Sequence, residues 1–297
     1  MWDGLVDVLF GWFFDLLYIL MVSICKVIDF LVDIFYKLAG LDTVNVDGKE
    51  SDLLSHFLQS NNVKVAFFAV VLIGVILLCL FVIIAILRSE YADSSQKRSK
   101  SQILTKAGHS LLLFLLVPFV LIAGITLTNV IMGAINNGML VNITGGGKAS
   151  FGGQILVTSG NGAWIGGSGR EQIEQNFING SIDYSNLDLV KQYYKIKDLN
   201  FLVGIGSSSI LLVLFALSAL RFVQRIFDII LLYIISPVSI STIPIDDGSR
   251  FKLWRESLIT KVLSAYGIIL SMNLFFLIIP QINKITFYDN SFGNGLI

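Results

Sequence analysis

Two long apolar runs, separated by a short polar segment, lie in the first half of the chain. Residues 65–87 contain no charge, and at about 1.5 Å per helical residue they can cross the roughly 30 Å hydrocarbon core of a bilayer. Residues 111–135 form a second run of similar length, in which Pro118 and Gly124 predict a kinked rather than a broken helix. We therefore expect a transmembrane hairpin.

The segment between the two runs is basic. Only Glu90 and Asp93 oppose its five cations, which are Arg88, Lys97, Arg98, Lys100 and Lys106. Short loops rich in Lys and Arg stay on the cytoplasmic side, so the hairpin is expected to enter and then leave the cytoplasm. A nucleic-acid patch is the weaker interpretation, because only Tyr91 interleaves the charges with an aromatic ring.

Composition supports a membrane protein. The chain is 55% hydrophobic and 14% charged, with a mean hydropathy of +0.77, which excludes an ordinary soluble domain. The formal net charge is zero, so the whole chain is not expected to attract nucleic acid. The two cysteines, Cys25 and Cys79, lie in apolar runs, and we expect no disulfide framework, metal site or cofactor.

Residues 1–40 are predicted to form an amphipathic helix, alone or as a pair. Its charges recur at a helical interval: Asp3, Asp7, Asp15, Lys26, Asp29, Asp33 and Lys37. The opposite face is apolar: Leu5, Val8, Leu9, Trp12, Phe13, Leu16, Leu17, Leu20, Ile24, Ile28, Leu31 and Phe35. The longest uncharged piece, residues 16–25, is too short to span, which favours an interfacial or bundle-packed helix. The acidic stripe suggests a protein partner, with Asp3, Asp7 and Asp15 as candidate subunit-interface or lumen residues.

Residues 136–200 are rich in Gly, Asn and Ser, and their five basic residues are matched by five acidic ones. A long loop without basic excess can be translocated, so this is the expected extracytoplasmic region. Short strands are predicted at 154–157 and 163–165, and short helices at 172–178 and 187–194. The fragment GGGKAS at 145–150 is not read as a phosphate loop, because Ala149 follows Lys148 where that motif needs Ser or Thr.

A third span is predicted at residues 201–220. Gly204 and Gly206 would let another helix approach closely, and Arg221 and Arg225 would end the span on the cytoplasmic side.

The following apolar run, 226–245, is ambiguous because Asp228, Pro237 and Pro244 interrupt it. If it crosses the membrane, the basic stretch 246–261 is external and violates the charge rule. If both basic stretches are cytoplasmic, 226–245 is re-entrant or interfacial. A last span is predicted at 262–279.

The chain offers no set of nucleophile, base and orienting acid, and we expect no enzyme activity. Asp228 is the one ionisable candidate deep in an apolar run, and because it lies next to Arg225, an interfacial ion pair or a charge at a helix end is its expected role. A small-solute transporter is the alternative function, weakened because no other midplane charge is present.

The run RFVQRIFDIILLYIISPVSISTIPIDDGSRFKLWRESLITK carries a family resemblance. An arginine-bearing helix, Ser236-Pro237 at the end of an apolar run, and a loop with Gly248, Phe251 and Trp254 precede the last span. Together with the N-terminus and the hairpin, it resembles the TrbL or VirB-six-like polytopic membrane subunit of type IV secretion systems, in the version of Gram-positive conjugative elements.

The resemblance implies an all-α membrane protein with about five transmembrane helices, an external N-terminus and a cytoplasmic C-terminus, so that 226–245 crosses. The expected parts are the N-terminal helix and connector (1–62), the hairpin (63–135), a small extracytoplasmic loop region (136–200), a C-terminal bundle (201–283) and a tail (284–297).

The implied function is non-enzymatic: a channel or scaffold subunit that helps DNA–protein substrate across the bacterial cytoplasmic membrane. Implied partners are further copies of the chain, other secretion subunits, ATPases, a single-stranded DNA–relaxase substrate in passage, and the lipid bilayer. Candidate interface or lumen residues are Asp3, Asp7, Asp15, Gly204, Gly206, Arg221, Arg225, Asp228, Pro237 and Trp254. A membrane scaffold or immunity protein is a third class without a specific sign.

Overall fold

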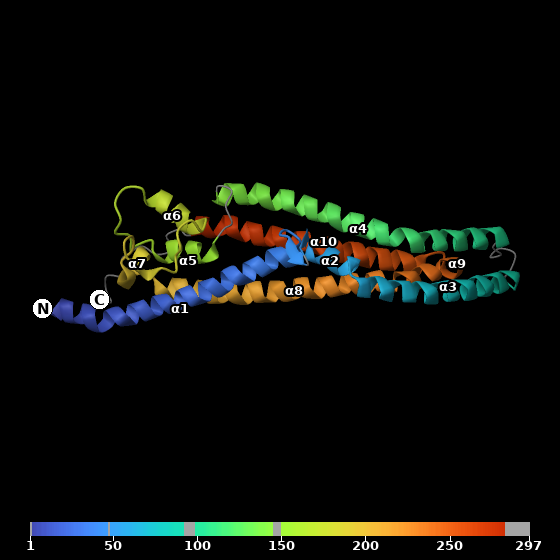
Figure 1. The fold of residues 1–297 in the computed structure, drawn as a ribbon, viewed down its shortest axis with the longest axis horizontal. Coiled ribbons are helices and arrows are strands. Elements are labelled where there is room, and N and C mark those ends of the chain that lie inside the picture. Colours follow the sequence, from blue (N-terminus) through green and yellow to red (C-terminus); the bar gives the residue numbers. More distant parts are fainter. Residues whose placement is uncertain (1, 47, 92–98, 145–149, 283–297) are drawn as a thin grey trace. The chain divides into compact units, whose positions relative to one another are not determined.

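The computed structural model describes residues 2–46, 48–91, 99–144 and 150–282, and the described chain is mainly helical (Figure 1). Five helices are long: α1 (Trp2–Ala39), α3 (Asn61–Glu90), α4 (Lys100–Thr144), α8 (Phe201–Ser241) and α10 (Ser249–Ile282). The shorter ones are α2 (Leu53–Gln59), α5 (Phe151–Ser159), α6 (Arg170–Ile178), α7 (Leu187–Val190), the 3-10 turn η1 (Ile196–Asp198) and α9 (Ile243–Asp246). A small antiparallel hairpin pairs β1 (Val44–Val46) with β2 (Lys49–Ser51).

Two compact units divide the chain. Unit 1 comprises residues 1–35, 134–219 and 268–297, and unit 2 comprises residues 36–133 and 220–267. The long helices α1, α4, α8 and α10 each contribute to both units.

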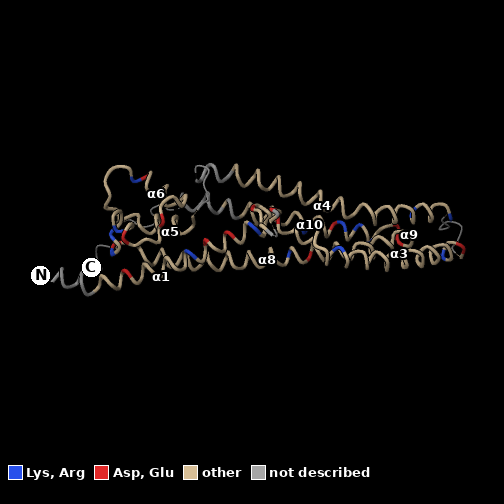
Figure 2. The backbone as a smooth tube through the Cα atoms, viewed as in Figure 1, with Lys and Arg blue, Asp and Glu red and all other residues tan. Residues whose placement is uncertain are grey.

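Among the residues that the structure describes, three helices are long and apolar enough to cross a membrane: Asn61–Glu90, Lys100–Gly138 and Phe201–Ser241. Figure 2 shows the long charge-free stretches of α4 and α8. The predicted class of helical membrane protein, including both helices of the hairpin, agrees with this architecture.

Unit 1 is built around the second half of α1 and the short helices between residues 150 and 199. Tyr18, Met21, Cys25 and Ile28 of α1 are buried there. On the predicted apolar face, Trp12, Phe13, Leu16 and Leu20 of the first half of the helix are exposed, whereas Ile28 and Phe35 of the second half are buried. Polar contacts decide which face of α1 is covered. Tyr18 and the acidic residues of α1 bind the 150–191 region, so the face that carries Tyr18 packs against that region.

The local predictions for residues 136–200 were confirmed in part. Residues 172–178 lie in α6, but α7 ends at Val190, and residues 154–157 are helical in α5 instead of a strand. Ser150 caps the start of α5 by accepting a bond from Gly153 N, which provides a helix start where the glycines suggested turns. Of the predicted strand 163–165, only an isolated bridge between Trp164 and Tyr194 forms.

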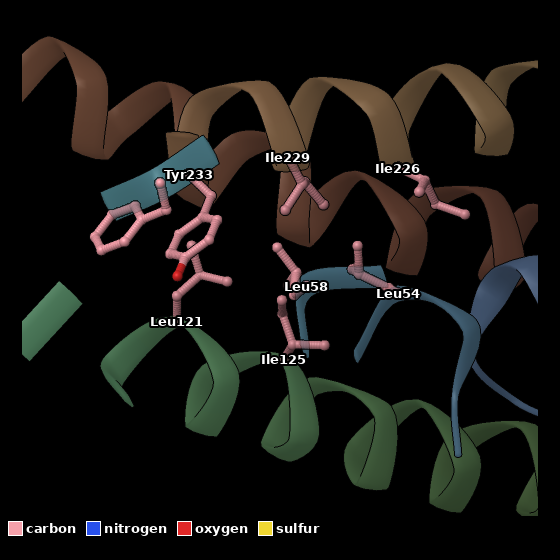
Figure 3. Close-up of a cluster of buried hydrophobic side chains, with 8 residues drawn as sticks. Leu54, Leu58, Leu121, Ile125, Ile226, Ile229 and Tyr233 are labelled. Atoms are coloured by element: carbon pink, nitrogen blue, oxygen red, sulfur yellow. The ribbon is translucent and has the colours of Figure 1, made fainter. Parts of the chain in front are cut away.

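Unit 2 has its core where α2 meets α4 and α8. Leu54 and Leu58 of α2 point toward Leu121 and Ile125 of α4 and toward Ile226 and Ile229 of α8 (Figure 3). Phe67 of α3 stacks on Tyr233 at 4.5 Å between ring centroids. Part of the polar connector predicted at 41–62 is thus a short helix, α2, whose apolar side chains belong to the core of this unit.

Helix α8 corrects the predicted segmentation of the C-terminal half. It runs without interruption from Phe201 to Ser241, through Arg221, Arg225 and Pro237. The third predicted helix therefore does not end at Arg221, and residues 226–241 are not a separate segment that crosses back or re-enters, because a continuous helix does not reverse direction. Pro237 lies inside the helix, whereas the sequence placed it at the end of an apolar run.

The chain turns at residues 242–248, beside the start of α4. Lys106 of α4 forms an ion pair with Asp247, and the Ser110 hydroxyl donates to the Ile240 carbonyl at 3.2 Å. The basic stretch 246–261 therefore begins at the same end of unit 2 as the basic start of α4. The two basic stretches need not lie on opposite sides of a membrane, which removes the conflict seen in the sequence.

Candidate functional site

Two polar clusters, each centred on a charged side chain, hold together segments that are distant in sequence, one in each unit. In unit 1 the group is the α1 carboxylate cluster, defined as Asp29, Ser150, Tyr184 and the amides of Phe151 and Gly152. In unit 2 it is the α8–α10 charge cluster, defined as Arg225, Asp228 and Lys261.

Asp29 is the centre of the α1 carboxylate cluster. Its Oδ1 accepts bonds from Phe151 N at 2.8 Å and Gly152 N at 3.3 Å. Its Oδ2 accepts bonds from the Tyr184 hydroxyl at 2.8 Å and the Ser150 hydroxyl at 3.1 Å. The two amides are the first of α5, where N–H groups have no helical partner and the helix dipole favours negative charge. Asp29 therefore fixes the start of α5 to α1.

Two glycines and a tyrosine complete this contact. A Cβ on Gly152 would overlap the Tyr184 ring, and a Cβ on Gly153 would overlap the Phe177 carbonyl. The Tyr18 hydroxyl also donates to the Tyr184 carbonyl. Burial and the neighbouring Asp29 raise the pKa of Tyr184 above its ordinary value, so Tyr184 stays a hydrogen-bond donor well into the alkaline range.

Asp15 makes a second contact of the same kind, since its carboxylate pairs with Lys191 Nζ at 2.9 Å. Asp15, Tyr18, Cys25 and Asp29 follow alternating three- and four-residue steps with Val22 between them, which places them on one stripe of α1. The acidic stripe thus binds the chain's own 150–191 region at two points. Asp3 and Asp7 lie in α1, but their side chains are outside the described part, so their predicted role stays a prediction.

The predicted glycine packing on α8 holds at one of two positions. Gly204 is buried, and a Cβ there would lie 2.5 Å from Met21 Sδ of α1. Gly206 is exposed, and a Cβ there would meet nothing within 4 Å. In unit 1, therefore, Gly204 gives α8 its close approach to α1, and Gly206 faces outward.

Arg225 is the most deeply buried charge of the α8–α10 charge cluster, with 5% of its surface exposed. Its Nε donates to the Lys261 carbonyl at 3.0 Å, and its Nη2 donates to the Val262 carbonyl at 3.2 Å. The guanidinium also lies 5.8 Å from the centre of the Phe222 ring. The cation is held by carbonyl dipoles of α10, and within the described residues no carboxylate lies in ion-pair contact with it.

Asp228 forms an ion pair, one of its two predicted roles, and the partner is Lys261 Nζ at 2.6 Å, not the neighbouring Arg225. The reason is position: Lys261 approaches Asp228 from α10, while the Arg225 fork is engaged by backbone of the same helix. Arg221 faces outward and is exposed. Of the three charges predicted together on α8, the structure brings Arg225 and Asp228 to α10 and leaves Arg221 outside.

The Ser236-Pro237 pair has a local explanation. Pro237 lacks the N–H that would bond the carbonyl of Tyr233 one turn earlier, and the buried Ser236 hydroxyl donates to that carbonyl at 2.7 Å. A Cβ on Gly74 of α3 would lie 2.9 Å from Pro237 Cβ, so α3 approaches closely here. Trp254 Nε1 donates to the Leu232 carbonyl at 2.8 Å, which ties α10 to the same part of α8.

Sequence reasoning missed Ser150, Tyr184 and Lys261, and named Asp29 only as one charge of the stripe. Ser150 followed by Phe151 and two glycines is a helix N-cap pattern that could have been found. No local signal pairs Asp29 with residue 150 or Lys261 with Asp228, because the partners lie 121 and 33 residues apart.

Both clusters attach one helix to another: α5 to α1 in unit 1, and α10 to α8 in unit 2. Among the residues that the structure describes, no three His, Cys, Asp or Glu side chains are grouped so that they could hold a metal ion. Comparison with family models, with curated proteins and with solved structures finds no match to this chain.

Proposed function

We propose that this chain is a subunit of a membrane-embedded assembly, and the observation that carries the proposal is the apolar surface of α8. Exposed apolar side chains extend from Leu202 (84% exposed) to Ile235 (39% exposed). That distance is about 50 Å along the helix axis, against a hydrocarbon core of about 30 Å. A tilt of more than about 50° would be needed to immerse it all, beyond the roughly 40° seen in membrane helices.

The exposed Arg221 divides this surface into two zones. One contains Ile210, Leu214 and Leu217, and the other contains Phe227 and Leu231. A charged side chain is costly in the hydrocarbon core, so Arg221 belongs near an interface and the two zones do not share one lipid environment. The zone outside the bilayer requires cover by protein, and a further copy of the chain supplies that cover in an oligomer.

The assembly we propose is the channel or scaffold of a conjugative type IV secretion system. The support is the resemblance carried by residues 221–261, together with helices joined by backbone-directed contacts. Such a subunit would help DNA–protein substrate across the bacterial cytoplasmic membrane, with separate ATPases as partners.

The topology that we propose has four membrane-crossing helices in place of the expected five or so. We propose that α3, α4, α8 and α10 cross the membrane and that α1 is a fifth long helix packed along the bundle. The basic stretches at 88–106 and 246–261 would both be cytoplasmic by the charge rule. Residues 150–200 and the C-terminus would then be external, the latter against the family expectation.

Reporter fusions test this topology. Phosphatase and fluorescent-protein fusions after residues 95, 170, 249 and 297 should report inside, outside, inside and outside. An external result at 249 would overturn the arrangement, and an internal result at 297 would remove α10 as a span.

Transfer assays test the function. An in-frame deletion in a host that carries the element should abolish conjugative transfer while growth and solute uptake stay normal, and the wild-type chain supplied in trans should restore transfer. Normal transfer would refute the proposal, and a selective loss of solute uptake would favour the transporter alternative.

Cysteine cross-linking tests the oligomer. Ile210→Cys and Phe227→Cys are made separately after the exposed Cys79 is replaced by Ala, with the buried Cys25 retained. Oxidation in membranes should give disulfide-linked dimers for one zone and not for the other. Monomers at both positions, with labelling of both by a lipid-soluble maleimide, would contradict cover by a second copy.

A further inference from the structure

An apolar groove runs along unit 2 between α4 and α10, and none of the contacts described above fills it. Its volume is about 400 Å³, and Leu116, Val120, Leu258 and Val262 are among the side chains that form its walls. It extends from residue 113 to 128 on α4 and from 251 to 263 on α10, about 20 Å of helix. That is close to the depth of one leaflet with its headgroups, half of a bilayer of about 40–45 Å.

The wall of the groove is hollowed at Gly124. A Cβ built there would meet nothing within 4 Å, so the absence of a side chain leaves open space in the middle of α4. One end of the groove is bounded by a bond between the two helices, in which the Tyr266 hydroxyl donates to the Thr128 carbonyl at 3.2 Å. A chain-like ligand would therefore enter from the opposite end.

The opposite end carries the cation Arg255, the one charged residue of the lining. Helical side chains lean toward the N-terminus of their helix, so Arg255 extends toward Ser249 and the end where both basic stretches begin. The nearest acidic residue in sequence, Glu256, pairs with Lys252 at 3.9 Å, and no carboxylate of the described residues forms an ion pair with Arg255. An apolar slot of leaflet length with a free cation at its basic end matches one lipid molecule in charge and in polarity.

We propose that this groove binds one acyl chain of an anionic phospholipid, whose phosphate is held by Arg255. A partner helix fits less well, because a helix is about 10 Å across and the groove volume is at the low end of small-molecule sites. Basic pockets between membrane helices on the cytoplasmic side are suited to anionic headgroups. The inference goes beyond the proposed function; it rests on the proposed membrane topology and not on a role in secretion.

Photolabelling tests the groove. The full chain is reconstituted into vesicles of equal parts phosphatidylcholine and phosphatidylglycerol that contain a trace of either lipid with a diazirine on its acyl chain. After illumination, labelled peptides are identified by mass spectrometry. The wild type should label within 113–128 and 251–263, more strongly with phosphatidylglycerol than with phosphatidylcholine. Equal labelling by the two lipids would overturn the assignment of an anionic lipid, and no labelling of these peptides by either lipid would overturn the groove as a lipid site.

Matched variants separate the chain from the headgroup. Gly124→Leu fills the hollow and should reduce labelling of the groove peptides several-fold, while Gly133→Leu on the same helix, also beside open space, should leave it unchanged. Arg255→Gln should lower the preference for phosphatidylglycerol about fivefold, whereas Arg250→Gln, at a residue paired with Asp246, should not. The site would be refuted if each variant and its control gave the same labelling. Because Arg255→Gln leaves the groove walls intact, it still tests the site if Gly124→Leu fails to fold.

Discussion

The two clusters hold opposite charges, the half-buried Asp29 and the buried Arg225, by opposite use of the backbone. In unit 1 the carboxylate of Asp29 accepts bonds from amides at the start of α5, where the N–H groups have no helical partner. In unit 2 the guanidinium of Arg225 donates to carbonyls in the middle of α10, where each oxygen keeps a second lone pair. An anion needs a helix end, whereas a cation can be placed at many points along a helix.

The two units should therefore differ in how strongly they depend on their charged side chain. The donors around Asp29 lose their acceptor if the carboxylate is removed, so the contact determines whether α5 stays attached to α1. The carbonyls around Arg225 lie inside a continuous helix, where backbone donors satisfy them. We therefore expect unit 1 to be sensitive to loss of its charge and unit 2 to be tolerant.

The largest effect is expected for Asp29→Ala, which leaves four donors without their acceptor. The free energy of unfolding should fall by about 3 kcal/mol, and amide exchange in residues 150–160 should accelerate. Thermal unfolding in detergent micelles and hydrogen exchange measure these changes. Asp29→Asn, which keeps one acceptor oxygen, should lose less, and equal stability of all three proteins would remove the asymmetry between the units.

Ser236→Ala is expected to cost about 1–2 kcal/mol, because it leaves the Tyr233 carbonyl, already without the Pro237 N–H, unbonded and buried. Ser207→Ala is the matched control on α8, since Ser207 bonds the Val203 carbonyl of a turn that contains no proline. Thermal unfolding of the two variants should differ in midpoint. A control as unstable as Ser236→Ala would mean that the hydroxyl does not replace the missing donor.

Arg225→Met is expected to change the free energy of unfolding by no more than about 1 kcal/mol, and to raise it if the cost of desolvating the cation exceeds the gain from its hydrogen bonds. Met fills much of the same volume with apolar atoms, and the two carbonyls keep their helical bonds. Chemical denaturation in micelles measures the change. A loss as large as that of Asp29→Ala would show that both units depend on their charge equally.

Lys191→Ala tests the second point of contact of the α1 stripe. The Asp15–Lys191 pair is partly exposed, with side-chain exposures of 33% and 42%, so we expect a loss below about 1 kcal/mol that salt reduces. Repeating the unfolding at high ionic strength measures the salt dependence. A loss independent of salt would assign the effect to packing of the lysine stem.

Raising the pH into the alkaline range should remove the contribution that Tyr184 makes to stability at neutral pH. The pKa of Tyr184 is raised in the folded chain, so its contribution to stability is fully present below the ordinary tyrosine pKa of about 10 and is lost as the pH rises toward the raised value. Protease protection of residues 150–190 should therefore decline with rising pH. Tyr184→Phe should flatten the decline, and an unchanged pH profile would show that Tyr184 does not contribute.

The sequence determined the class of the protein and its long helices. Charge-free runs longer than a bilayer is thick have few alternatives to a spanning helix, which is why α3 and α4 appear where the apolar residues do. The helical interval of charges in residues 1–40 likewise predicted α1, because that periodicity is local.

The tertiary structure decided where helices end and what the charges contact. Arg221 and Pro237 are the usual signs of a helix end, yet α8 continues past both, because a hydroxyl replaces the donor that Pro237 lacks and α10 buries Arg225. The partners of Asp29 and Asp228 lie on elements far away in sequence, and no local pattern specifies them. Hydrophobic length and periodicity are properties of neighbouring residues, whereas the compensation of a buried charge or a missing hydrogen bond depends on which helix packs against it.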